Sequence, residues 1–169
     1  MGRIVVGIDG STSSRRALVT SLRMAEINGD LVDVVHAWEP ITDAPYAHRE
    51  QAPSERAQEH AAWSLLANEL DAIEREAEII DVRSVVTRGR PSAVLIDIAK
   101  GARFVALGTG HTSLTATGHL GSVALEVVRH APCPVVLVPP VSAIEFLNEG
   151  NEPAKLPLSE YEDADSAFV

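Results

Sequence analysis

Residues 103–140 read RFVALGTGHTSLTATGHLGSVALEVVRHAPCPVVLVPP and decide the fold. Two apolar runs, RFVALGT (103–109) and CPVVLVPP (133–140), enclose a helical pattern in SVALEVVRHA (122–131). The stretch 107–122, which joins the first run to the helix, holds four glycines. This order is typical of a strand, a crossover helix and a second strand parallel to the first.

The same alternation extends back to the N-terminus. Apolar runs rich in β-branched residues predict three further strands, at 3–9, 30–38 and 80–87. Helical spacing predicts helices from Ser11 to Asn28, from Ser54 to Ala77 and from Pro91 to Gly101. The chain therefore reads β-α-β-α-β-α-β-α-β, which predicts an α/β layer fold with a parallel sheet.

Length and charge limit the possible classes of protein. A chain of 169 residues is long enough for one domain, which we expect at 1–140. Residues 141–169 hold seven acids against one base, Lys155, so we expect an acidic, mobile C-terminal tail. A net charge of -10 argues against a nucleic-acid partner. No apolar run reaches the roughly 20 residues of a membrane helix, and Cys133 is the only cysteine, so we expect a cytoplasmic protein.

Two turns that follow predicted strands carry residues suited to a nucleotide. In GIDGS (7–11), Asp9 closes the first strand, and its carboxylate could accept hydrogen bonds from ribose hydroxyls or an adenine amine. Gly121 and Ser122 begin a helix, whose free N–H groups and positive dipole end favour an anion. Simpler alternatives are a turn or capping role for Asp9 and a plain tight turn for the glycines. The sequence contains no GxxxxGK[ST] motif, and Ser113 stands where GxGxxG needs its third glycine.

Three segments resemble the universal stress protein family: VVGIDGSTSSRRAL, VVHAWEP and LGTGH…LGSVALEVVRHAPCPVVLVPP. The match spans residues 3–139, and GSVALEVVRHAPCPVVLV is its most specific part. The resemblance implies an open five-stranded parallel sheet of order 3-2-1-4-5 with helices on both faces, similar to the adenine-nucleotide alpha-hydrolase architecture. It also implies a homodimer in which the fifth strands of two copies meet.

Nucleotide-binding members of that family are similar in one loop pattern: Gly, two residues, Gly, nine residues, then Gly and Ser or Thr. Gly108, Gly121 and Ser122 match this pattern. The middle glycine does not match, because His111 stands at its position and Gly110 comes one place early. Either a local rearrangement brings Gly110 to the phosphates, or His111 crowds the site.

The resemblance also implies a role for each matching residue. Asp9 would contact adenosine, and the backbone of Ala37 would contact adenine. The residues expected around the ribose and phosphates are Gly108, Gly110, His111, Gly121, Ser122 and Val123. The ligand would be ATP or a related adenine nucleotide, with or without Mg²⁺. Arg15 and Arg16 either lean toward the phosphate or point to solvent.

Three functions remain open at this stage. The first is a cytoplasmic, dimeric, nucleotide-binding module of the stress response. The second is a slow ATPase, although Asp9 is the only acid predicted beside the loop and no catalytic residue is assigned. The third is a nucleotide-free interaction protein, favoured if His111 blocks the crevice. We expect neither a membrane nor a metal site.

Overall fold

The computed structural model describes residues 2–41, 53–73, 80–110 and 120–139. Strands and helices alternate along these ranges. They are β1 (Arg3–Gly7), α1 (Thr12–Asn28), β2 (Leu31–Trp38), α2 (Glu55–Asp71), β3 (Val82–Arg88), α4 (Pro91–Ile98), β4 (Phe104–Gly108), α6 (Ser122–His130) and β5 (Val135–Val138). The five strands form one parallel sheet of order β3-β2-β1-β4-β5. The predicted fold class and strand order are confirmed.

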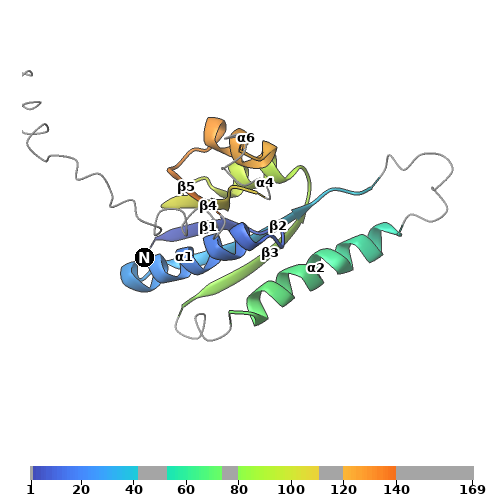
Figure 1. Ribbon diagram of the computed structural model, residues 1–169, viewed down its shortest axis with the longest axis horizontal. Coiled ribbons are helices and arrows are strands. Elements are labelled where there is room, and N and C mark those ends of the chain that lie inside the picture. Colours follow the sequence, from blue (N-terminus) through green and yellow to red (C-terminus); the bar gives the residue numbers. More distant parts are fainter. Residues whose placement is uncertain (1, 42–52, 74–79, 111–119, 140–169) are drawn as a thin grey trace, which may run out of the picture.

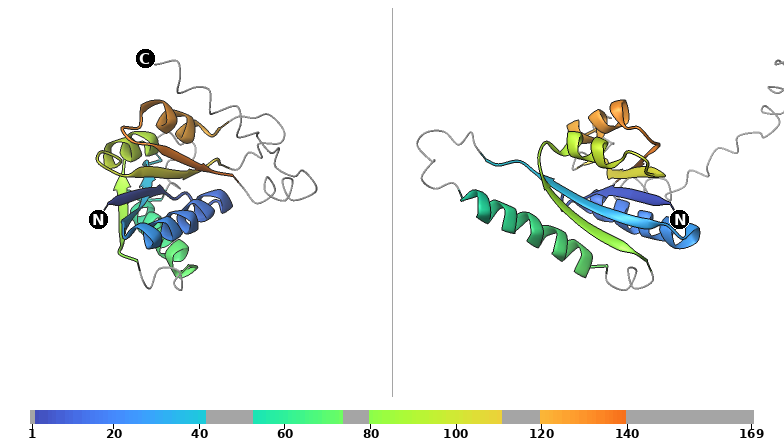
Figure 2. Two further views of the ribbon diagram at one scale, coloured as in Figure 1. Left: turned by 90° about the vertical axis from the view of Figure 1, so that its left-hand side faces the viewer. Right: turned by 180° about the vertical axis from the view of Figure 1, so that it is seen from behind.

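The helices cover both faces of the sheet, with α1 and α2 on one face and α4 and α6 on the other (Figures 1 and 2). Alternate residues of each strand point to opposite faces, so each face has its own apolar core. Ile4, Leu18 and Leu66 are fully buried or nearly so on the α1 and α2 side. Val105 and Val127 are fully buried on the α4 and α6 side.

Local chemistry fixes most helix ends. Ser11 caps α1, because its side chain accepts a hydrogen bond from the backbone nitrogen of Ser14. Gly29 ends α1 in the left-handed conformation, with a φ of 64°. Ser54 caps α2 in the same way as Ser11 caps α1.

The predicted end of the second helix was wrong. α2 stops at Asp71, whereas apolar spacing predicted a helix that reached Ala77. Ile73 is buried with 4% of its surface exposed, but it lies in a turn rather than in the helix. An apolar residue at helical spacing can face the core without being helical, which explains the error. Ala77 lies outside the described residues.

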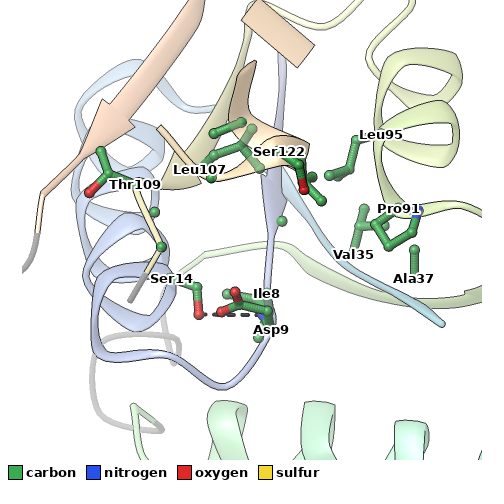
Figure 3. Close-up of a pocket in the computed structure, with 16 residues that line it drawn as sticks. Ile8, Asp9, Ser14, Val35, Ala37, Pro91, Leu95, Leu107, Thr109 and Ser122 are labelled. Atoms are coloured by element: carbon green, nitrogen blue, oxygen red, sulfur yellow. Dashed lines mark hydrogen bonds between the residues drawn. The ribbon is translucent and has the colours of Figure 1, made fainter. Parts of the chain in front are cut away.

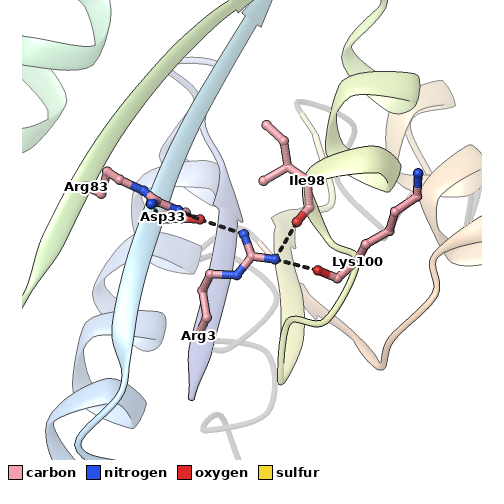
Figure 4. A network of polar contacts seen from close by, with 5 residues as sticks. All are labelled: Arg3, Asp33, Arg83, Ile98 and Lys100. Atoms are coloured by element: carbon pink, nitrogen blue, oxygen red, sulfur yellow. Dashed lines mark hydrogen bonds and ion pairs between the residues drawn. The ribbon is translucent and has the colours of Figure 1, made fainter. Parts of the chain in front are cut away.

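A buried carboxylate, which the sequence analysis did not predict, links the sheet to α4 (Figure 4). Asp33 on β2 is fully buried and accepts hydrogen bonds from Arg3 Nη1 at 2.9 Å and from Arg83 Nε and Nη2 at 2.8 and 2.7 Å. Arg3 Nη2 also donates to the carbonyl oxygens of Ile98 and Lys100, at the C-terminal end of α4. These bonds compensate the cost of burying the Asp33 charge and tie α4 to β1 and β2.

The described helices include none that is long and apolar enough to cross a membrane. The acidic segment 141–169 lies outside the described residues, so its predicted mobility stays a prediction.

Candidate functional site

The carboxyl ends of β1, β2 and β4 surround a pocket of about 350 Å³ (Figure 3). The chain order of the sheet reverses between β1 and β4, which are neighbours. Ligands of open parallel sheets bind outside the strand ends at such a reversal. Seven of the predicted site residues line this pocket: Asp9, Ala37, Gly108, Gly110, Gly121, Ser122 and Val123. The eighth, His111, lies outside the described residues.

Asp9 is held by the turn between β1 and α1. Its Oδ1 accepts a hydrogen bond of 2.9 Å from the backbone nitrogen of Ser11, and its own backbone nitrogen lies 3.4 Å from Ser14 Oγ. The turn role that the sequence left open is therefore present. Asp9 also remains solvent-exposed at the pocket, so the same carboxylate can meet a ligand.

Ala37 lies past the end of the β1 ladder. The last residue pair between β1 and β2 joins Gly7 to Val35, whereas β2 continues alongside β3 as far as Trp38. At Ala37 the edge of β2 that faces β1 therefore has no strand partner in the ladder. A strand edge of this kind can offer its backbone groups to a planar heterocycle in the pocket.

Gly108 is needed for packing. A Cβ atom at this position would lie 2.5 Å from Ser13 Oγ and 2.5 Å from the backbone nitrogen of Ser14. The end of β4 therefore passes against the first turn of α1 at a distance that only glycine allows. This contact fixes the spacing between the Asp9 turn and the glycine loop.

Gly110 and Gly121 have different requirements. Gly110 has a φ of 91°, a conformation that favours glycine, and Ser13 Oγ lies 3.4 Å from its carbonyl oxygen. Gly121 has a φ of −57°, and a Cβ there would meet nothing closer than Thr109 O at 3.8 Å. A Cβ on Gly110 would lie 3.9 Å from Gly121 Cα, so the two ends of the loop close on each other.

The N-terminus of α6 faces the pocket. Gly121 is its N-cap and supplies no side-chain hydrogen bond, and Ser122, Val123 and Ala124 of the first turn line the pocket. The first N–H groups of a helix have no partner within the helix and carry partial positive charge. Because the N-cap residue Gly121 has no side chain, the first N–H groups of α6 remain accessible to an anion.

Apolar walls complete the site, and the sequence analysis missed them. Val35, Pro91 and Leu95 lie together along one side with Ala37, as Figure 3 shows, and Ile8 and Leu107 add to the lining. In the sequence these residues look like ordinary core positions. β3 lies at the far edge of the sheet, yet α4 crosses back over β2 and brings Pro91 and Leu95 to the pocket.

Two arginines near the pocket are engaged elsewhere. Arg15 makes two hydrogen bonds to Glu69, at 2.8 and 2.7 Å, and thereby links α1 to α2. This contact raises the pKa of the Arg15 guanidinium. Arg16 donates to the carbonyl oxygen of Pro139 at 2.6 Å. Neither lines the pocket, and both hold protein groups rather than pointing freely to solvent.

His36 and Cys133 both lie outside the pocket and have structural surroundings. His36 Nδ1 lies 2.7 Å from the carbonyl oxygen of Ile8, as expected for a hydrogen-bonded residue within a strand. Burial raises the pKa of the Cys133 thiol, which favours an inert side chain. Within the described ranges, no three His, Cys, Asp or Glu side chains gather as a metal site requires.

Comparisons with known proteins agree on one family. Residues 1–139 match the family model described as "Universal stress protein family". A universal stress protein of Thermus aquaticus is 31% identical over 140 residues, which cover 80% of this chain and 96% of that protein. A universal stress protein of Mycobacterium tuberculosis is 30% identical over 135 residues, or 79% of this chain and 43% of that protein. The chain thus spans less than half of this longer relative.

Solved structures share the fold. A universal stress protein in complex with cAMP has a TM-score of 0.62 and 23% identity, with coverage of 81% of this chain and 95% of that one. The universal stress protein of Archaeoglobus fulgidus in complex with dAMP has a TM-score of 0.59 and 24% identity, with coverage of 82% and 98%.

Proposed function

The chain belongs to the universal stress protein family, and we propose that it binds an adenine nucleotide in the pocket at the ends of β1, β2 and β4. One observation carries the proposal. Three groups suited to the three parts of a nucleotide line one pocket: the edge of β2 at Ala37, the Asp9 carboxylate, and the N-terminus of α6 at Gly121. The cAMP and dAMP complexes of proteins with this fold support the same ligand class.

The adenine ring would lie between the apolar walls. Val35, Pro91 and Leu95 supply apolar surface against the ring faces. Beyond the β1 ladder, Ala37 supplies backbone groups for the ring edge. An apolar slot with a few fixed polar groups is typical of a small-molecule site.

The ribose and phosphate would extend from Asp9 to α6. Asp9 accepts hydrogen bonds from hydroxyl groups, and the first turn of α6 donates backbone hydrogen bonds to phosphate oxygens. Gly121 suits phosphate binding, because an N-cap residue without a side chain leaves open space at the start of α6 where a phosphate would lie. Among the described lining residues Asp9 is the single carboxylate, so Mg²⁺ would have to arrive with the phosphates.

Native mass spectrometry of the purified protein, followed by release and identification of any bound small molecule, tests the proposal directly. Calorimetry with adenosine, AMP and ATP then gives affinities. Gly121→Val should abolish nucleotide binding and leave the fold intact, because a φ of −57° suits valine while its side chain fills the helix start. Unchanged affinity in this variant would place the ligand elsewhere.

The biological role that we propose is a stress-response module in the cytoplasm whose state reports nucleotide binding. The family supports a stress-response role. We assign no catalytic residues: Asp9 is the single carboxylate among the described residues that line the pocket, and no three His, Cys, Asp or Glu side chains of the described ranges gather as a metal site requires. A purified protein that hydrolyses ATP, with a rate that falls on Asp9→Ala, would contradict this assignment.

We further propose that the protein forms a homodimer through β5. This strand lies at the edge of the sheet and is only four residues long, which suits a short, defined pairing. Val136→Lys would place a charge on the strand, and Leu137→Pro would remove a backbone donor. Light scattering should show a dimer for the parent protein and monomers for the variants. A monomeric parent at micromolar concentration would refute the dimer.

A further inference from the structure

The pocket and its loop are poor in positive charge. The segment 108–123 contains no lysine or arginine. Among the described residues that line the pocket, Asp9 is the single ionisable side chain, and it is an acid. Among the described residues, anion binding would therefore depend on backbone N–H groups and hydroxyls. Such groups can hold one phosphate at a helix N-terminus, but they do not neutralise a chain of phosphates.

The cations on α1 are not available to compensate. Arg15 is fixed by the two hydrogen bonds to Glu69, whose side chain is 93% buried. Releasing Arg15 toward a ligand would leave the buried Glu69 carboxylate without its partner, which is costly. Arg16 is turned toward the end of β5 by its bond to Pro139.

The cations beside α4 also lie outside the pocket. Arg88 pairs with Glu55 on α2. Arg90 lines a separate groove between α4 and α6 together with Lys100 and Glu126. The turn after β3 therefore contributes the apolar Pro91 to the pocket while its two arginines lie elsewhere.

From this charge distribution we infer that the pocket prefers an adenine nucleotide with a single phosphate to the triphosphate. The inference rests on the proposed function and adds a ligand class to it. ATP carries about two more negative charges than AMP at neutral pH. In this pocket they would meet the Asp9 carboxylate, and the described lining residues include no cation to offset them. Repulsion of this size at a protein surface weakens binding by about tenfold.

Calorimetry at pH 8, where histidine side chains are neutral, tests the inference with adenosine, AMP and ATP in the presence of EDTA. We expect the Kd for ATP to exceed that for AMP by at least about tenfold. Raising NaCl from about 20 to about 200 mM should narrow this gap, because salt screens repulsion. Adding Mg²⁺ should narrow it too, because the cation neutralises part of the triphosphate charge.

Arg16→Gln and Arg15→Gln are the matched variants, since both arginines lie on α1 but outside the pocket. Each should leave the ratio of the ATP and AMP dissociation constants unchanged. If the Arg15→Gln variant does not fold, the Arg16→Gln variant and the NaCl series still test the preference for AMP over ATP. A parent protein that binds ATP as tightly as AMP, loses ATP affinity with salt, or loses it selectively in either variant would overturn the inference alone. A parent that binds none of the three ligands would overturn the proposed function, and this inference with it.

Discussion

Gly108→Ala should destabilise the fold, although the family pattern marks Gly108 as a residue that surrounds the ligand. The added Cβ would lie 2.5 Å from Ser13 Oγ, 2.5 Å from the backbone nitrogen of Ser14 and 2.6 Å from the carbonyl carbon of Ser13. Two of these three atoms belong to the backbone of α1. A change of side-chain rotamer cannot relieve that overlap, so the helix itself would have to move.

The expected loss is about 3 kcal/mol, at the upper end of the range for adding a methyl group to a packed site. α1 cannot move freely, because Leu18 and Leu22 of the same helix are fully buried against the sheet. In a domain of this size such a loss lowers the midpoint of thermal unfolding by about 6–12 °C. Urea unfolding followed by circular dichroism gives the free energy, and a thermal scan gives the midpoint.

Gly121→Ala is the control, because it adds the same atom to the other end of the loop. The φ of −57° suits alanine, and the new Cβ would make an ordinary contact of 3.8 Å with Thr109 O. The free energy of unfolding should therefore change by less than about 1 kcal/mol. If Gly108→Ala lowers the free energy of unfolding no more than this control does, the close approach of β4 to α1 is not what requires glycine at position 108.

Three further predictions concern residues away from the pocket. The Arg103 guanidinium, aided by the Gly2 N–H, lowers the pKa of Asp30 against the opposing effect of burial. The ionised Asp30 therefore stabilises the folded protein above the pKa of an unfolded aspartate, about 3.9. This contribution to the free energy of unfolding disappears as pH falls through the lower pKa of the folded state. Asp30→Asn should therefore destabilise the protein at pH 7 but not in strong acid, as urea unfolding across pH can show. Asp33→Ala should cost about 1.5–3 kcal/mol in urea unfolding, because it removes the hydrogen bonds that the buried carboxylate accepts from two arginines; a loss below about 0.5 kcal/mol would contradict this. Iodoacetamide should alkylate Cys133 more slowly at pH 8 than it alkylates a small free thiol, because burial raises the pKa of Cys133, and equal rates would contradict this.

Much of the fold could be predicted, because the spacing of apolar residues and the residues that begin or end helices indicate the same elements along most of the chain. Ser11, Gly29 and Ser54 mark helix ends in the sequence and cap helices in the structure. The Asp33 network could not be predicted in the same way. An acid within the strand pattern DLVDVVHAW gives no sign that two arginines, 30 and 50 positions away, reach it across the sheet.

The polar part of the pocket was easier to predict than its apolar walls. Asp9 closes a predicted strand and Gly121 begins a predicted helix, at the places where ligands bind parallel sheets. Both residues can therefore be recognised in the sequence as candidate site residues. Leu95 and Val35 do not stand out, because an apolar residue that faces a ligand looks the same in a sequence as one that faces the core. Only the path of α4 over β2 separates the two cases.

The shifted glycine of the loop has a conformational reason. The chain needs a residue of positive φ directly after Thr109, and Gly110 supplies it with a φ of 91°. Glycine at the next position would not meet this need, because Gly110 is where the chain leaves β4 and its carbonyl oxygen approaches Ser13 Oγ. The contact ties the loop to the same helix turn that Gly108 packs against. Gly110 therefore serves the turn that follows β4, while Gly108 and Gly121, the two glycines that match the family pattern, line the pocket.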